Sequence, residues 1–265
     1  MLDIDQYAYS NNLRSIHPVE KTIFALLTMI ICLAANSIIT SLAIILLMAG
    51  VVIFGAKIPR QFFIKLILIP ISFLLISTIT IVISISKEAS SFLYYLSLWG
   101  WKIGIQMENI IFAINLFLKS LGTVSCLYFL ALTTPMIEII SVLRKLKVPR
   151  IFIELMSLIY RFIFVLLDNA NLIRTSQLSR LGYSNFKRSC QSLSKLISNL
   201  FIRAYYRAKG LLTTLLARGY EGEIRVLEPE YEFSKKNLAI IFLVEVSLIL
   251  ITVYIGGDQF VIINT

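Results

Sequence analysis

The chain has 265 residues, of which 58% are apolar and 15% charged, whereas soluble domains carry about 25% charged residues. This composition excludes a disordered chain, a coiled coil and a disulfide scaffold. It also argues against an ordinary soluble globular domain. The chain has 25 Lys and Arg against 15 Asp and Glu, which gives a formal net charge of +10. A chain this apolar and this basic is expected to cross a membrane and to keep its positive charge outside the spans.

Cysteine and histidine indicate no metal site. Cys32, Cys126 and Cys190 lie far apart, and no CxxC or HxxxH spacing occurs. The single histidine, His17, cannot form a histidine-rich site. The first 21 residues are polar and carry both charge signs, so no signal peptide is evident. We therefore predict no metal, no cofactor and no catalytic residue.

The first long apolar stretch runs from Thr22 to Phe54 and contains no charged residue. As one helix it would be roughly 50 Å long, although the hydrocarbon core of a membrane is only about 30 Å thick. The polar residues Asn36 and Ser37 lie near its middle. We predict two short helices joined there, and one tilted helix is the alternative.

Three further apolar stretches follow along the chain. The stretch Phe62–Ser86 contains Pro70, which should bend the helix. The stretches Ile105–Leu132 and Leu238–Ile255 are the remaining candidates for membrane spans. Glu245 lies inside the last stretch, and we expect it to face the interior of the helical bundle because a charge facing lipid is costly.

The stretch Ile151–Leu167 is also apolar, but it carries Glu154 and Arg161. We predict a partly buried helix that leaves the membrane rather than a sixth full span. The fold class is thus an all-α integral membrane protein with about five transmembrane helices and long cytoplasmic amphipathic helices. We divide it into a membrane region at 1–134, a cytoplasmic or interfacial region at 135–236, and a last span with an external tail at 237–265.

The positive charge is concentrated between Pro135 and Lys236, where 17 Lys and Arg face eight acidic residues. Basic segments next to membrane spans stay in the cytoplasm. Five spans then place the N-terminus and this basic region inside the cell and the C-terminus outside.

The basic region has the pattern of helices rather than of a disordered loop. Thr134-Pro135 is typical of a helix start, and Val148-Pro149 is typical of a helix end. A long helix is predicted from about Arg150 to Arg180, and a second amphipathic helix from about Lys187 to Arg218. Gly182 and Gly219 are predicted to end these two helices.

The two long helices end in similar motifs, Ser179-Arg180-Leu181-Gly182-Tyr183 and Ala217-Arg218-Gly219-Tyr220. An arginine at a helix C-terminus has an ordinary structural explanation, because it complements the helix dipole and bonds the last carbonyl groups. The functional alternative is a helix end that presents a guanidinium fork to carboxylates of a soluble partner.

These residues resemble the transmembrane T component of energy-coupling factor transporters, and most closely the cobalt-type subgroup (the CbiQ and EcfT proteins). Ala217-Arg218-Gly219 matches the Ala-Arg-Gly signature of that family. The first motif departs from it, since Ser179 replaces alanine and Leu181 separates Arg180 from Gly182. The resemblance extends over nearly the whole chain, and its further matches are His17-Pro18-Val19-Glu20-Lys21, Thr134-Pro135, Val148-Pro149, Tyr160-Arg161 and the lead-in Arg203–Ala208.

The resemblance implies a non-catalytic subunit that couples two ABC-type ATPases to a separate substrate-binding membrane subunit. Its two cytoplasmic helices would dock in the ATPases, and ATP-driven closure of the ATPases would shift these helices. It places the chain in the plasma membrane of a bacterial cell and favours cobalt or nickel as the substrate. The residues that the resemblance assigns to ATPase docking are Arg180, Gly182, Ala217, Arg218 and Gly219.

Three other function classes fit the sequence less well. An integral-membrane enzyme would need a converging catalytic set, and the sequence offers one histidine and no GxSxG motif. A self-sufficient transporter usually needs more polar residues in its spans than Glu245 and Pro70 supply. Nucleic-acid binding is not favoured, because the basic residues lie beside a membrane, where ATPases or anionic headgroups explain them better.

Overall fold

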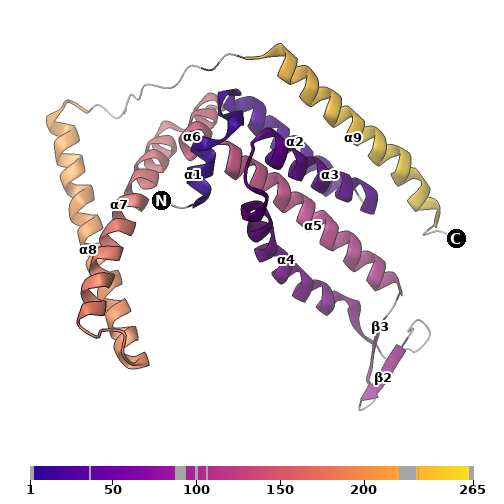
Figure 1. Cartoon of the computed structure of the whole chain (residues 1–265), viewed down its shortest axis with the longest axis horizontal. Coiled ribbons are helices and arrows are strands. Elements are labelled where there is room, and N and C mark those ends of the chain that lie inside the picture. The colour runs from indigo at the N-terminus through magenta and orange to yellow at the C-terminus, as the bar shows by residue number, and fades with distance from the viewer. Residues whose placement is uncertain are drawn as a thin grey trace. The chain divides into compact units, whose positions relative to one another are not determined.

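The computed structural model describes residues 3–35, 37–86, 94–98, 101–105, 107–220, 231 and 233–262. The chain divides into two compact units. Residues 2–135 and 230–265 form the first, here called the membrane unit, and residues 136–229 form the second, here called the α6–α8 unit. Figure 1 labels the α-helices of both units and colours the chain from the N-terminus to the C-terminus.

The membrane unit is built mainly from helices. The stretch from Thr22 to Phe54 forms two helices, as predicted, because the backbone is extended at Ala35 and Ser37. Asn36, the other residue of the predicted junction, lies outside the described residues. The elements are α1 (Asp3–Ser10), the 3-10 turn η1 (Asn12–Ser15), α2 (Pro18–Ala34), α3 (Ile38–Gly50), the π-helical turn η2 (Val51–Gly55), α4 (Arg60–Val82), α5 (Met107–Thr133) and α9 (Lys235–Ile262).

Within the described residues, four segments are long and apolar enough to cross a membrane: Ile38–Gly55, Arg60–Val82, Asn109–Thr133 and Lys235–Tyr254. The fifth expected span, α2, has 17 residues. A helix of that length measures about 26 Å, somewhat less than the hydrocarbon core of about 30 Å. The helix that contains residues 151–167 is not among the four. The helical membrane fold predicted from the sequence is confirmed, and one short sheet is the exception to it.

One local prediction was wrong. The helix predicted to reach Ser86 ends at Val82, and three short antiparallel strands follow: β1 (Ile83–Ser86), β2 (Tyr94–Leu98) and β3 (Trp101–Ile105). The strand order is β1-β3-β2. The sequence Ile-Ser-Ile-Ser of β1 alternates β-branched and polar residues with a period of two, which favours a strand over a helix.

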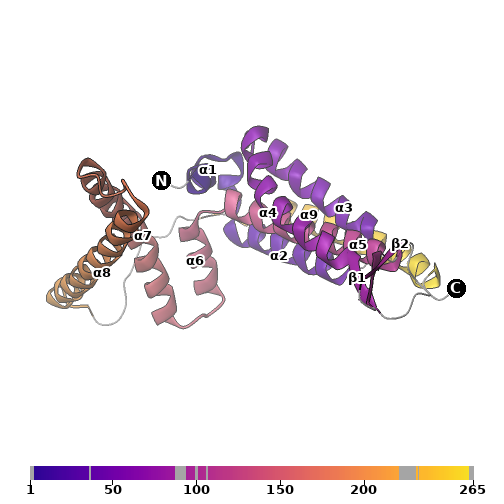
Figure 2. The same cartoon turned by 90° about the horizontal axis from the view of Figure 1, so that it is seen from below.

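Helix α5 lies at the centre of the membrane unit and packs against α1, α2, α3 and α4, as Figures 1 and 2 show. Phe24 of α2 and Phe129 of α5 make an edge-to-face contact with ring centroids 5.4 Å apart. A Cβ atom on Gly122 would lie 2.8 Å from the Cys32 Sγ atom, so glycine permits the close approach of α5 to α2. Apolar burial around α5 thus holds this unit together.

Polar contacts attach α9 to α2 inside the same unit. Glu245 is only 5% exposed, and its Oε1 atom lies 2.9 Å from the Thr28 hydroxyl, which confirms that it faces the bundle interior. Glu20 is 1% exposed and accepts hydrogen bonds from the Ser234 backbone N–H at 3.0 Å and from the Asn237 side chain at 3.1 Å. The His17 ring stacks on Phe233 with ring centroids 3.8 Å apart. These contacts fix the beginning of α9 beside the beginning of α2.

The α6–α8 unit consists of α6 (Met136–Lys145), α7 (Arg150–Ser179) and α8 (Phe186–Ala217). The predicted start at Thr134-Pro135 is correct to within one residue, since α6 begins directly after Pro135. The two long helices match their predicted ranges to within one residue at each end. Helix α7 packs against both α6 and α8.

Candidate functional site

The first arginine motif forms a regular C-terminal cap on α7. Arg180 occupies the cap position with φ −101° and ψ 19°, and Leu181 follows in the left-handed region with φ 55°. The Gly182 N–H donates to the Gln177 carbonyl at 2.8 Å, and the Leu181 N–H donates to the Leu178 carbonyl at 3.0 Å. These two bonds define a Schellman motif, which satisfies carbonyl groups that a helix end leaves unpaired.

The second motif forms the same cap on α8. Arg218 has φ −97° and ψ 12°, and Gly219 follows with φ 75°. The Tyr220 N–H donates to the Leu215 carbonyl at 3.0 Å, and the Gly219 N–H donates to the Leu216 carbonyl at 3.1 Å. Arg180 and Arg218 are therefore structurally equivalent, although their sequence motifs differ by one residue.

The first motif forms the same cap although Leu181 separates its arginine from its glycine. Leu181, not Gly182, stands where Gly219 stands, so a leucine adopts the left-handed conformation at a cost of about 1–2 kcal/mol. Gly182 is needed for a different reason. A Cβ atom there would lie 2.7 Å from the Ser192 hydroxyl oxygen and 2.8 Å from the Gln177 carbonyl oxygen.

Three side-chain bonds fix the corner between α7 and α8. The Ser192 hydroxyl donates to the Gly182 carbonyl at 2.8 Å, and the Gln177 amide donates to the Ser192 carbonyl at 2.8 Å. The Tyr183 hydroxyl donates to the Gln177 Oε1 atom at 2.8 Å. Gln177 and Ser192 were not predicted as site residues, because their bonds depend on how two helices meet.

Gly182→Ala is expected to destabilise this corner by about 1–3 kcal/mol, because the added methyl group overlaps backbone and hydroxyl atoms. Thermal unfolding of the purified protein measures the change. Gly210→Ala is the matched control, since Gly210 lies inside α8 and an added Cβ atom there would have no neighbouring atom within 4 Å. That control should be neutral or stabilising by about 0.5–1 kcal/mol, because alanine favours helix. Equal melting temperatures for both variants would contradict the prediction.

The second motif is attached to the opposite end of α7. The Tyr220 hydroxyl donates to the Glu154 carboxylate at 2.6 Å, across 66 residues of sequence. This hydrogen bond, helped by desolvation, raises the pKa of the Tyr220 phenol above its ordinary value of 10.0. A tyrosine with a raised pKa stabilises the folded protein below its unfolded pKa, and the contribution is lost as the pH rises through the folded pKa. The contact should therefore persist at neutral pH.

Tyr220→Phe is expected to loosen the second motif without unfolding either helix, because only the hydroxyl that reaches Glu154 is removed. Faster hydrogen–deuterium exchange at amides 216–220 would report the change at pH 7. The difference in exchange between the unsubstituted protein and Tyr220→Phe should shrink when the pH rises above the folded pKa of Tyr220. Tyr205→Phe, at an exposed position of α8, is the control and should leave the exchange unchanged.

The two arginine motifs lie at opposite ends of an antiparallel helix pair. Contacts run from Gln177–Ser192 at one end, through Arg203–Asn169 at 3.4 Å, to Tyr220–Glu154 at the other end. Figure 1 shows the two helices side by side, with the corner at one end. Helix α8 has 32 residues, and a helix of that length measures about 48 Å. The two arginines are therefore too far apart to contact one small site together.

Both guanidinium groups are open to solvent. Arg180 and Arg218 are exposed, and so are Ala217 and Gly219, whereas Gly182 is half-buried. Among the residues that the structure describes, neither guanidinium makes a hydrogen bond or an ion pair. An exposed Arg fork on a fixed cap can bind a carboxylate in a bidentate manner. No group of three metal-binding side chains occurs in the described part of the chain.

Comparison with known proteins decides the family. Residues 9–229 match the family CbiQ, described as cobalt transport protein. The chain belongs to this cobalt transport family. It is 30% identical to the cobalt transport protein CbiQ of Salmonella typhimurium over 226 residues, which cover 85% of this chain and 100% of that protein. The resemblance found from the sequence is confirmed, and the protein is a multi-pass membrane component of the cobalt and energy-coupling factor transporter group.

Two other relatives extend the match over almost the full length. An uncharacterized protein of Methanocaldococcus jannaschii is 34% identical over 255 residues, with 96% of this chain and 94% of the relative covered. The energy-coupling factor transporter transmembrane protein EcfT of Exiguobacterium sibiricum is 30% identical over 251 residues, with 90% and 92% covered. The CbiQ family match includes α7, α8 and both arginine motifs.

Proposed function

We propose that this CbiQ-family protein is the coupling subunit of an ATP-driven importer, in which Arg180 and Arg218 each dock on one ABC-type ATPase. The observation that supports the proposal best is the pair of equivalent arginine caps at the two ends of one helix pair. Two separate docking points suit two separate ATPase subunits. The proposed docking residues are Arg180, Gly182, Ala217, Arg218 and Gly219.

Motion of the ATPases would pass through the helices as rigid bodies. The Schellman caps and the corner bonds connect each arginine to a helix of at least 30 residues, so a shift of the docked end moves the whole helix. Helix α8 also exposes apolar side chains along its length, and these suit a membrane partner such as a substrate-binding subunit. The exposed residues include Leu193, Ile197, Phe201, Tyr205 and Leu212.

The proposed orientation follows the charge. The α6–α8 unit carries most of the positive charge and belongs in the cytoplasm, with the N-terminus inside and the C-terminus outside. We place the protein in the plasma membrane of a bacterial cell. We propose cobalt or nickel as the transported ion, with the choice made by the substrate-binding subunit, and we assign this subunit no catalytic step.

Reconstitution tests the proposal. The protein is co-expressed with the two ATPases and the substrate-binding subunit of a cobalt transporter from the same cell, and both co-purification and uptake of radioactive cobalt are measured. We expect a stable complex and ATP-dependent uptake that requires every subunit. Uptake by this chain alone would instead support a self-sufficient transporter, and failure to bind either ATPase would remove the docking role.

A further inference from the structure

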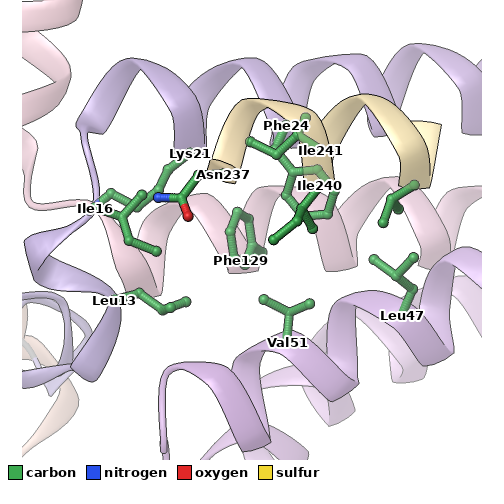
Figure 3. A pocket seen from close by; sticks show the side chains of 11 residues that line it. Leu13, Ile16, Lys21, Phe24, Leu47, Val51, Phe129, Asn237, Ile240 and Ile241 are labelled. Carbon is green, nitrogen blue, oxygen red and sulfur yellow. The ribbon is translucent and has the colours of Figure 1, made fainter. Parts of the chain in front are cut away.

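A partly open apolar pocket of about 300 Å³ lies in the membrane unit, between the beginnings of α2 and α9 and the turns η1 and η2 (Figure 3). Its lining side chains are apolar except for Lys21 and Asn237. Phe24 and Phe129 form part of its wall, and Ile241 of α9 faces them. The pocket is therefore a hydrocarbon-lined space within a bundle of membrane helices.

The pocket has a polar end and an apolar end. Lys21 and Asn237 lie together at one end, and Leu47 lies at the other (Figure 3). The Lys21 Nζ atom donates to the Thr133 carbonyl at 3.0 Å, and the Asn237 amide donates to Glu20. This distribution follows the chemistry of a membrane lipid, which has a polar headgroup and a hydrocarbon chain.

The apolar side chains that line the pocket favour an apolar occupant over water. An ordered water needs two to four polar partners, which this lining does not offer along its apolar part, and even an enclosed apolar cavity of about 150 Å³ binds a molecule as large as benzene. Atoms that line an unfilled gap lose dispersion contacts, so a chain that fills it is favoured. Leu47 and Val51 belong to the candidate span Ile38–Gly55, and Ile241 belongs to the span Lys235–Tyr254, so acyl chains are the neighbouring solvent.

Three exposed basic residues are close in sequence to residues that line the pocket. Lys235 and Lys236 directly precede Asn237 and are exposed. Lys236 is four residues from the lining residue Ile240, which places both on one face of α9. Arg14 is exposed between the lining residues Leu13 and Ile16; one of its five donors bonds the Tyr9 carbonyl. Exposed cations beside a membrane span attract anionic headgroups.

We propose that this pocket is a binding site for an anionic phospholipid. One acyl chain fills the apolar space between α2, α5 and α9, and the phosphate lies beside Lys235, Lys236 and Arg14. The bound lipid would support the packing of α9 against the rest of the unit, because its chain contacts side chains from each of these helices. The site is separate from the arginine motifs and does not depend on ATPase docking.

Native mass spectrometry of the delipidated, detergent-purified full chain tests the proposal with added phosphatidylglycerol or phosphatidylcholine. We expect one phosphatidylglycerol molecule to bind more tightly than any other and more tightly than phosphatidylcholine. Val244→Phe, which fills the pocket, should abolish this tight binding. Val253→Phe on the exposed face of the same helix is the control and should retain it. Equal binding by both variants at equal melting temperature would overturn the site.

The headgroup contact is tested separately. The double variant Lys235→Gln/Lys236→Gln should weaken phosphatidylglycerol binding about 10- to 30-fold, because each basic residue near an anionic lipid contributes about 1 kcal/mol. Lys195→Gln/Lys209→Gln removes the same charge from exposed positions of α8 and should change nothing. Equal affinity for the two lipids would show that only the acyl chain binds. An equal loss in the two double variants would show general charge attraction. Either result would overturn the proposed headgroup contact.

Discussion

Arg218→Ala is expected to weaken binding of one ATPase subunit by about 2–5 kcal/mol, the usual cost of removing one partner from a buried charge pair. The loss is large because the carboxylate of the partner would stay desolvated and unpaired. Membrane insertion and helix packing should not change, since the guanidinium is exposed and makes no bond within the described residues. Arg218→Lys should restore only part of the binding, because an ammonium group cannot bind a carboxylate in a bidentate manner.

Co-purification of ATPases with membranes of each variant, together with cobalt uptake, measures this effect. Arg207→Ala removes an arginine from an exposed position inside α8 and is the matched control. Arg180→Ala should reduce binding at the other end of the helix pair. Because a helix of 32 residues separates the two caps by about 48 Å, the two losses should add in the double variant. Undiminished ATPase binding with normal uptake in the double variant would remove the docking role.

Glu20→Ala is expected to destabilise the membrane unit by about 3 kcal/mol or more. Its carboxylate is 1% exposed and accepts two hydrogen bonds from the beginning of α9, one from Ser234 and one from Asn237. A hydrogen bond to a charged group contributes about 1.5–3 kcal/mol, and a buried donor that loses its partner adds a desolvation cost. The beginning of α9 should therefore separate from α2 at a lower temperature than in the unsubstituted protein.

Thermal unfolding in detergent and protease access near residue 234 measure this second effect. Glu20→Gln keeps one acceptor oxygen but brings an amide donor against other donors, so an intermediate loss is expected. Asp168→Ala removes an acidic side chain from an exposed position and should change stability by no more than about 0.5 kcal/mol. A melting temperature of Glu20→Ala equal to that of Asp168→Ala would contradict a role for Glu20 in holding the beginning of α9 beside α2.

Local patterns in the sequence predict most of the helices. The apolar runs, Pro149 and the Arg-Gly motifs place α7 and α8 to within one residue, because helix ends depend on nearby residues. The polar junction at residues 36 and 37 likewise predicts two helices where the apolar run is continuous. The similarity of the two motifs around Arg180 and Arg218 is visible in the sequence. Their common cap geometry is not, because Gly182 lies one residue further from its arginine than Gly219 does.

Contacts between residues far apart in the sequence could not be predicted. The bond from Tyr220 to Glu154 spans 66 residues, and the bond from Asn237 to Glu20 spans 217. No periodicity of one helix specifies its partner on another. The strand Ile83–Ser86 was missed because its alternation of Ile and Ser covers only four residues and directly follows the apolar run of α4. Its pairing with β3 shows where the helix ends.

Leu181, in the left-handed position of the first cap, makes the two otherwise equivalent caps chemically different. A single chain that docked on a two-fold symmetric pair of ATPases, as proposed above, would do so through quasi-equivalent contacts, and the two caps of this chain differ in chemistry. One end presents a bulky, 68% exposed Leu181 beside its arginine, whereas the other presents a bare glycine backbone. Two identical motors would consequently bind with two different affinities and fill the ends in a fixed order, and two different motors would each have a preferred end.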